Sequence, residues 1–116
     1  MVFGMPRGRR HPYCLLLRYA LHFLRMIRSF RHKGLELFFR TGGKRGIQAK
    51  HAKRLRLILG RLDASLSPED MNLPGLFLHS LSGRSGIHSV RVSANWRVTF
   101  RFHGQHAEVV DYEDYH

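Results

Sequence analysis

The sequence predicts an α+β fold in which two N-terminal helices pack on one face of an antiparallel β-sheet. The first half of the chain has apolar residues at helical spacing, and residues 76–112 form short alternating runs between turns. Helices followed by consecutive strands are typical of α+β domains. The chain has 116 residues, a length that suits one domain with one core.

Residues 1–25 differ from the rest and are predicted to be an N-terminal extension to a folded domain at 26–116. Their apolar part is interrupted by Arg18 and His22, and it is shorter than the roughly 20 apolar residues that a membrane-spanning helix needs. We therefore expect no membrane span, and Arg18 also argues against a secretory signal. Two interpretations stay open: an accessory amphipathic helix, or translated upstream sequence with Met26 as the real start.

The chain from Met26 to Phe30 is expected to form a short edge strand. Residues 34–40 follow with Leu35, Phe38 and Phe39 at helical spacing. Glycine is the usual residue just past a helix end, so Gly42 predicts the end of this helix.

Gln48 to Ala64 is the clearest predicted helix. Its apolar stripe predicts the side that packs on the sheet, and the stripe consists of Ala52, Leu55, Leu59 and Leu62. The other side is basic and carries Lys50, Lys53 and Arg54. We expect this basic face to be solvated, and a solvated basic face is also what a polyanion meets first, so the three residues are candidate RNA-binding residues.

The remaining chain is expected to form an antiparallel meander. Ser67 and Pro68 predict the start of a one-turn helix, and residues 72–75 break the chain. The predicted strands cover residues 76–81, 88–92, 96–102 and 107–112.

The strand register predicts two arginines side by side. A three-residue loop at 93–95 pairs Val92 with Trp96, Val90 with Val98 and Arg91 with Arg97, and it keeps apolar and polar faces separate. In this register Asn95 takes the left-handed position. Like charges directly across from each other are destabilising, and a bound phosphate removes that penalty. In the next hairpin, Arg101 across from Glu108 is expected to be an ordinary ion pair.

Charge and cysteine content limit the function. The chain has 20 Lys and Arg against 8 Asp and Glu, a formal charge of +12. Such an excess favours a polyanionic partner, first nucleic acid and then a membrane surface or an acidic protein. The single cysteine, Cys14, excludes an internal disulfide framework and a cysteine-based zinc cluster. It suits a reducing, cytoplasmic compartment, and no metal or other cofactor is expected.

Several segments together resemble a known family. They are the segment that starts at Met26 (MIRSFRHKGL), Leu73-Pro74-Gly75, Leu78-His79, the segment SANWRVTF at 93–100 and the closing DYEDYH at 111–116. Over residues 26–116 the chain resembles HigB, the killer toxin of a toxin–antitoxin pair in the RelE superfamily. The resemblance implies a RelE-like fold, a ribosome-dependent endoribonuclease that cuts mRNA in the decoding site, and a helix-turn-helix antitoxin of the HigA type as partner.

The resemblance also implies site residues, namely His79, Arg97, Asp114, Tyr115 and His116. One family position differs. The family commonly has a lysine after His-Pro-Leu, whereas His79-Ser80-Leu81 is followed here by Ser82, and Arg84 is the nearest cation that could replace it. An alternative function therefore stays open: a catalytically weakened or non-enzymatic module that still binds RNA, ribosome and antitoxin. A membrane-surface protein acting through residues 13–24 is a third interpretation.

An RNA 2′-hydroxyl can serve as the nucleophile, so cleavage requires no metal. We expect Arg97, helped by Arg91 or Arg84, to bind the phosphate. The candidate base and acid are His79, Asp114 and His116, and histidine titrates near neutral pH. Tyr115 would orient the RNA or stack on it. The sequence leaves open which group removes a proton and which donates one.

Overall fold

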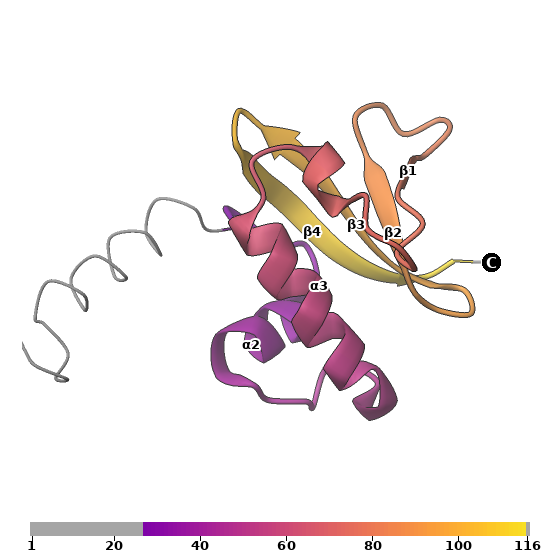
Figure 1. Cartoon of the computed structure of the whole chain (residues 1–116). Helices are drawn as coiled ribbons and strands as arrows, with labels where there is room; N and C mark the ends of the chain where they lie inside the picture. Colours follow the sequence, from indigo (N-terminus) through magenta and orange to yellow (C-terminus); the bar gives the residue numbers. More distant parts are fainter. Residues whose placement is uncertain (1–26, 116) are drawn as a thin grey trace, which may run out of the picture.

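The computed structural model describes residues 27–115, and these form a helical layer on one face of a four-stranded antiparallel sheet (Figure 1). The predicted α+β class, with helices before strands, is confirmed. The expectations for residues 1–25, for Met26 and for His116 lie outside the described residues.

Helix α2 covers Lys33–Thr41. Its first turn is capped by His32, whose Nδ1 atom accepts a hydrogen bond of 2.9 Å from the backbone N–H of Leu35. The helix ends at Gly42, which has the left-handed φ of 82° expected of a glycine cap. Leu35 and Phe38 are buried, so the predicted helix and its apolar side are confirmed.

Helix α3 covers Ala52–Ala64 and follows a 3₁₀ turn, η1, at Ala49–His51. Its buried side contains the four predicted stripe residues and Ile58. A second 3₁₀ turn, η2, covers Pro68–Met71, where one helical turn was predicted. The side chain of Ser67 does not cap this turn; the carboxylate of Asp70 instead accepts a 2.8 Å hydrogen bond from Leu66 N.

The sheet has the order β1-β2-β3-β4, and every neighbouring pair is antiparallel. The strands are β1 His79–Ser80, β2 His88–Ser93, β3 Trp96–His103 and β4 His106–Asp114. The first predicted strand, residues 76–81, is therefore much too long. Gly75 at φ 87° and Phe77 at φ 53° turn the chain there, and extended pairing needs negative φ.

The predicted edge strand at 26–30 is reduced to one bridge. Phe30 makes an isolated parallel bridge with Val110. The backbone N–H of Arg31 donates to Val110 O at 2.8 Å, and Val110 N donates to Ser29 O at 3.1 Å. These bonds place the segment along the outer edge of β4.

The β2–β3 hairpin agrees with the predicted register in part. Val90 pairs with Val98 and Arg91 with Arg97, as predicted. Trp96, however, pairs with Ser93 rather than Val92, because a bulge adds a residue to β2. The turn then has two residues, and its left-handed position falls on Ala94 at φ 45° rather than on Asn95.

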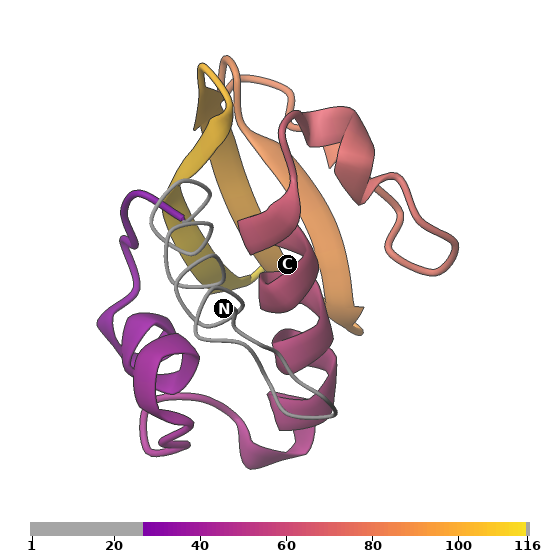
Figure 2. The same ribbon diagram turned by 60° about the vertical axis from the view of Figure 1, so that its left-hand side comes forward.

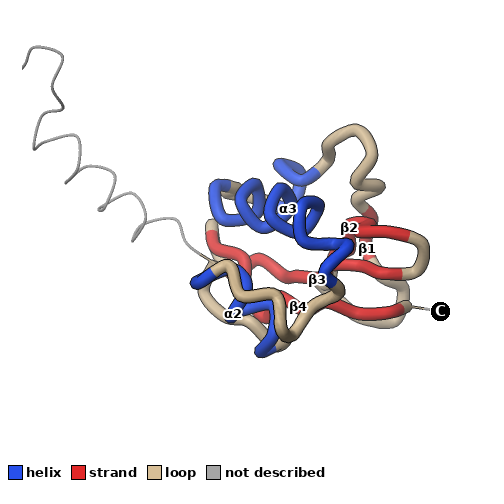
Figure 3. The backbone as a smooth tube through the Cα atoms, turned by 90° about the horizontal axis from the view of Figure 1, so that it is seen from below, coloured by secondary structure: helices blue, strands red, loops and turns tan. Residues whose placement is uncertain are grey.

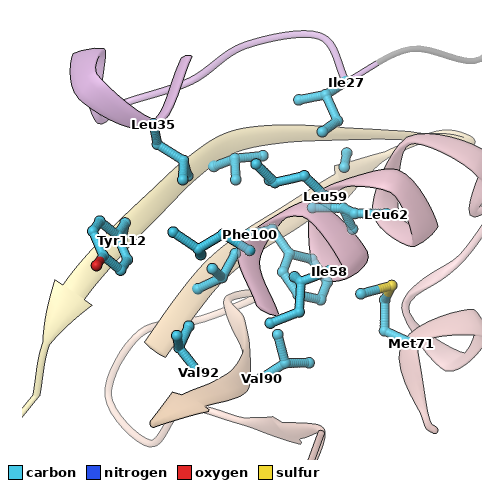
Figure 4. Packing of buried hydrophobic residues seen from close by; sticks show 14 of the residues in the cluster. Ile27, Leu35, Ile58, Leu59, Leu62, Met71, Val90, Val92, Phe100 and Tyr112 are labelled. Carbon is cyan, nitrogen blue, oxygen red and sulfur yellow. The ribbon is translucent and has the colours of Figure 1, made fainter. Parts of the chain in front are cut away.

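The helices lie against one face of the sheet (Figures 2 and 3), and the core lies between these two layers. Figure 4 shows Leu35 of α2, Ile58, Leu59 and Leu62 of α3, and Met71 of η2 packed with Val90, Val92 and Phe100 of the sheet. Since the helices cover this face, the polar side chains of alternate strand positions are left on the opposite face.

Candidate active site

Arg97 lies near the start of β3, on the face of the sheet that points away from the helices. The side chains of its neighbours Trp96 and Val98 belong to the core side. Because successive residues of a strand point to opposite faces, the side chain of Arg97 points the other way. The guanidinium is half-buried, and its Nε and Nη1 atoms have no hydrogen-bond partner among the described residues. A buried cationic donor without a partner is costly. This group is therefore suited to bind an anion.

Arg97 has one charged residue directly across from it on each neighbouring strand. Arg91 lies across on β2 and Glu113 across on β4. The predicted Arg91–Arg97 pair is thus confirmed, and two like charges so placed are destabilising by roughly 0.2–1 kcal/mol. Glu113 would relieve this repulsion if its carboxylate bound Arg97.

Glu113 is instead held by Arg84. Arg84 Nη1 donates to Oε1 at 3.2 Å and Nη2 to Oε2 at 2.8 Å, while the buried Thr99 donates to Oε2 at 3.0 Å. A hydrogen bond of 2.9 Å from Leu81 N to Ile87 O closes the loop that carries Arg84. The contacts of Arg84 therefore do not support the expectation that it binds phosphate. They explain why the carboxylate across from Arg97 leaves Arg97 unpaired.

Tyr115 lies beside Arg97 after the end of β4. Its backbone N–H donates a 2.8 Å hydrogen bond to Asn95 O, in the turn that leads into β3. Its ring centre is 6.0 Å from the Cζ atom of Arg97, within reach of a cation–π contact. The structure thus brings together two of the predicted site residues that are far apart in the sequence.

Asp114 lies on the other side of the sheet. It pairs directly across from Trp96, and paired residues point to the same face. The Trp96 ring contacts His51 and Tyr112 on the helix side. The structure therefore does not group Asp114 with Arg97, because neighbouring residues of a strand point in opposite directions.

His79 lies in β1, exposed, on the same face as Arg97 but two strands away. It pairs with Ser89, which pairs with Thr99, so it is a diagonal neighbour of Arg91. Its Nδ1 atom is 3.1 Å from Phe77 O. The exposed ring is therefore on the same side of the sheet as the guanidinium of Arg97.

The three basic residues predicted on the second helix separate into two groups. Lys50 and Lys53 are exposed. Arg54 is committed to the fold, because its Nη2 atom donates to Gly75 O and, at 3.1 Å, to Arg91 O. Lys50 and Lys53 belong to the helical layer, so they do not share the face that carries Arg97.

A buried histidine–tyrosine pair lies on the core side of the same strands, and the sequence did not reveal it. His51 is 3% exposed, and its Nδ1 atom lies 2.6 Å from the Tyr112 hydroxyl. Burial and then the nearby charge of Lys50 lower the pKa of His51. Burial raises the pKa of the Tyr112 hydroxyl, and the hydrogen bond from Gln48 N opposes this. This pair packs on the helix side of the sheet, where β3 begins and β4 ends.

Within residues 27–115, no three His, Cys, Asp or Glu side chains gather as a metal site. No helix in this part of the chain is both long and apolar enough to cross a membrane.

Two comparisons relate the chain to known proteins. Residues 28–116 match the family model described as the RelE-like toxin of the type II toxin–antitoxin system HigB. The chain is also similar to a curated protein of Proteus vulgaris, Endoribonuclease HigB. The two are 41% identical over 92 residues, which is 78% of this chain and 100% of that protein.

Proposed function

This chain belongs to the RelE-like HigB toxins of type II toxin–antitoxin systems, and we propose that it is an endoribonuclease that cleaves messenger RNA on the ribosome. As a type II toxin it has an antitoxin as its partner. We further propose that this antitoxin is a helix-turn-helix protein of the HigA type and that the toxin acts in the cytoplasm, where ribosomes translate.

The observation that carries the proposal is the guanidinium of Arg97, whose Nε and Nη1 atoms have no hydrogen-bond partner within residues 27–115, beside the ring of Tyr115. Arginine binds phosphate through charge-assisted hydrogen bonds, and unpaired bases stack on aromatic rings. The relative from Proteus vulgaris is named an endoribonuclease. Both observations support RNA as the substrate.

In the proposed reaction the RNA supplies its own nucleophile. A base takes the proton from a 2′-hydroxyl, the 2′-oxygen forms a bond to the adjacent phosphorus, and the bond from phosphorus to the 5′-oxygen breaks. An acid protonates the leaving 5′-oxygen, so the products carry a 2′,3′-cyclic phosphate and a 5′-hydroxyl. Arg97 stabilises the charge that develops on the phosphorane oxygens.

Of the three expected candidates for base and acid, His79, Asp114 and His116, this proposal assigns the two roles to the histidines. His79 faces the same side of the sheet as Arg97 and is a diagonal neighbour of Arg91. His116 follows Tyr115 directly in the sequence. The register places Asp114 toward Trp96, so in this proposal it orients the end of the chain rather than transferring a proton.

The test measures cleavage of a defined mRNA, free and bound to ribosomes, by the purified protein. Arg101→Ala is the matched control, because it removes the same charge from the same strand and face, and Arg101 is already paired with Glu108 at 2.8 Å. We expect Arg97→Ala to lose roughly 100-fold or more in rate and Arg101→Ala to remain active. A chain lacking Tyr115 and His116 should also be inactive. Undiminished cleavage by both site variants would refute the assignment.

A second candidate function is a weakened module that binds ribosome and antitoxin without cutting RNA. It is favoured by Ser82 at the family's lysine position and by the engagement of Arg84 with Glu113. Ribosome binding by the wild-type protein without any cleavage of bound mRNA would decide for this function.

A further inference from the structure

Phe77 combines an unfavourable backbone conformation with an exposed ring. Its φ is 53°, a region that bulky residues rarely adopt, and its side chain is 60% exposed. A strained residue that gains no burial is a candidate for function. The residue lies between η2 and β1, in the loop that replaces the start of the first predicted strand.

Hydrogen bonds join this loop to β2 and α3. Arg91 N donates a 2.7 Å hydrogen bond to Leu76 O. Arg54 bridges Gly75 O and Arg91 O with one nitrogen. The residues on the N-terminal side of Phe77 are thus tied to β2, and the ring is presented at a fixed position on the edge of the sheet.

The ring completes a row of four side chains across the end of the sheet. The Phe77 ring centre is 4.9 Å from Cζ of Arg91, Arg91 lies across from Arg97, and Cζ of Arg97 is 6.0 Å from the Tyr115 ring. Two aromatic rings therefore flank two guanidinium groups. Single-stranded nucleic acid has the complementary pattern, with phosphates between bases that stack on aromatic rings.

We propose that Phe77 is a stacking platform for an unpaired RNA base, one that flanks the phosphate held by Arg91 and Arg97. This inference rests on the proposed function, since it names a further contact of the same substrate. The ring lies against the guanidinium of Arg91, and a cation beside an aromatic ring suits a nucleotide, which has both a phosphate and a base. Stacking tolerates every base, so Phe77 positions the strand without selecting a sequence.

The first experiment detects stacking without cleavage. Phe77→Trp adds an indole to a chain with one native tryptophan, Trp96. The probe is a single-stranded 2′-O-methyl oligoribonucleotide, which has no free 2′-hydroxyl and is not cut. We expect this probe to quench the added fluorescence relative to wild type, and a matched probe with one abasic position to quench it less. Unchanged fluorescence when anisotropy shows the probe to be bound would overturn the proposal.

The second experiment separates stacking from a structural role. Phe77→Leu keeps apolar volume without the ring, and Phe77→Gly removes the ring but relieves the positive φ. We expect both to raise the KM for ribosome-bound mRNA by roughly 5- to 100-fold, with Phe77→Tyr closer to wild type than Phe77→Leu. The thermal unfolding midpoint of Phe77→Gly should not fall. Leu66→Ala is the control for loss of an exposed apolar side chain (51% exposed).

The two proposals fail in different ways. Absence of cleavage by wild-type protein refutes the endoribonuclease proposal, while the fluorescence experiment still decides whether Phe77 stacks on RNA bases. Cleavage by wild type with equal probe binding and equal KM for Phe77→Leu overturns the stacking proposal alone and assigns the exposed ring to a protein contact.

Discussion

Arg84 holds the carboxylate of Glu113 with both Nη atoms, at 3.2 and 2.8 Å, although Glu113 lies directly across the sheet from Arg97. The ion pair therefore keeps the Glu113 carboxylate from binding Arg97. It occupies the carboxylate that would otherwise neutralise Arg97, and it leaves the guanidinium of Arg97 available for the phosphate contact that we propose.

The Arg84–Glu113 ion pair predicts a loss of activity that a second substitution restores. Arg84→Ala frees Glu113 to bind Arg97, so we expect cleavage to fall roughly 10- to 100-fold, the equivalent of one charge-assisted hydrogen bond. The double variant Arg84→Ala with Glu113→Gln should recover most of the rate, because no carboxylate then competes for Arg97. If Arg84 binds the phosphate directly, the double variant stays as slow as the single one. Single-turnover cleavage of ribosome-bound mRNA measures both.

Restoring the family's lysine should raise activity. Ser82 is exposed in the loop between β1 and β2, where Ser82→Lys adds a cation near the face that carries Arg97. We expect about a tenfold gain in cleavage rate, the effect of roughly 1.4 kcal/mol of transition-state stabilisation. Ser85→Lys adds the same charge to the same loop and is the control. An equal gain in both variants would indicate a general charge effect rather than a placed lysine.

The buried His51–Tyr112 pair predicts acid sensitivity. The pKa of His51 is lowered in the folded protein, so the unfolded chain binds more protons and stability falls as pH drops below the ordinary histidine value of about 6.5. The slope from this one residue is at most about 1.4 kcal/mol per pH unit. His51→Gln keeps a polar partner for Tyr112 but does not titrate. Urea unfolding from pH 8 to pH 5 should give a flatter stability profile for this variant, and parallel profiles would contradict the prediction.

Two leucines of α3 test the helix–sheet core. Leu55 is fully buried and Leu57 is 59% exposed, although they lie two residues apart. We expect Leu55→Ala to lower the free energy of unfolding by about 2–5 kcal/mol, through lost burial and a cavity. Leu57→Ala should change it by about 0.5 kcal/mol or less. Similar losses for both, by chemical denaturation, would place α3 in a different orientation on the sheet.

The sequence by itself determined the features that depend on local periodicity. Alternation along residues 96–102 predicted β3, helical spacing predicted the buried side of α3, and consistent faces predicted the Arg91–Arg97 and Arg101–Glu108 pairs. These conclusions need only neighbours in the chain or in one hairpin. The sequence did not predict the bulges, because each one adds a residue without an evident change in the pattern.

Only the tertiary structure decided which arginine remains available to bind an anion. A regular β3–β4 ladder extended from the Arg101–Glu108 pair would place Tyr112 across from Arg97; the register shift near Val109, at φ 47°, places Glu113 there instead. Arg84 reaches that carboxylate from 29 residues away, and Arg54 donates to Gly75 O in a distant loop and to Arg91 O in β2. All these arginines carry the same charge in the sequence. Long-range contacts alone distinguish Arg97, which has two buried atoms without a hydrogen-bond partner in the described part of the chain, from those that the fold has already paired.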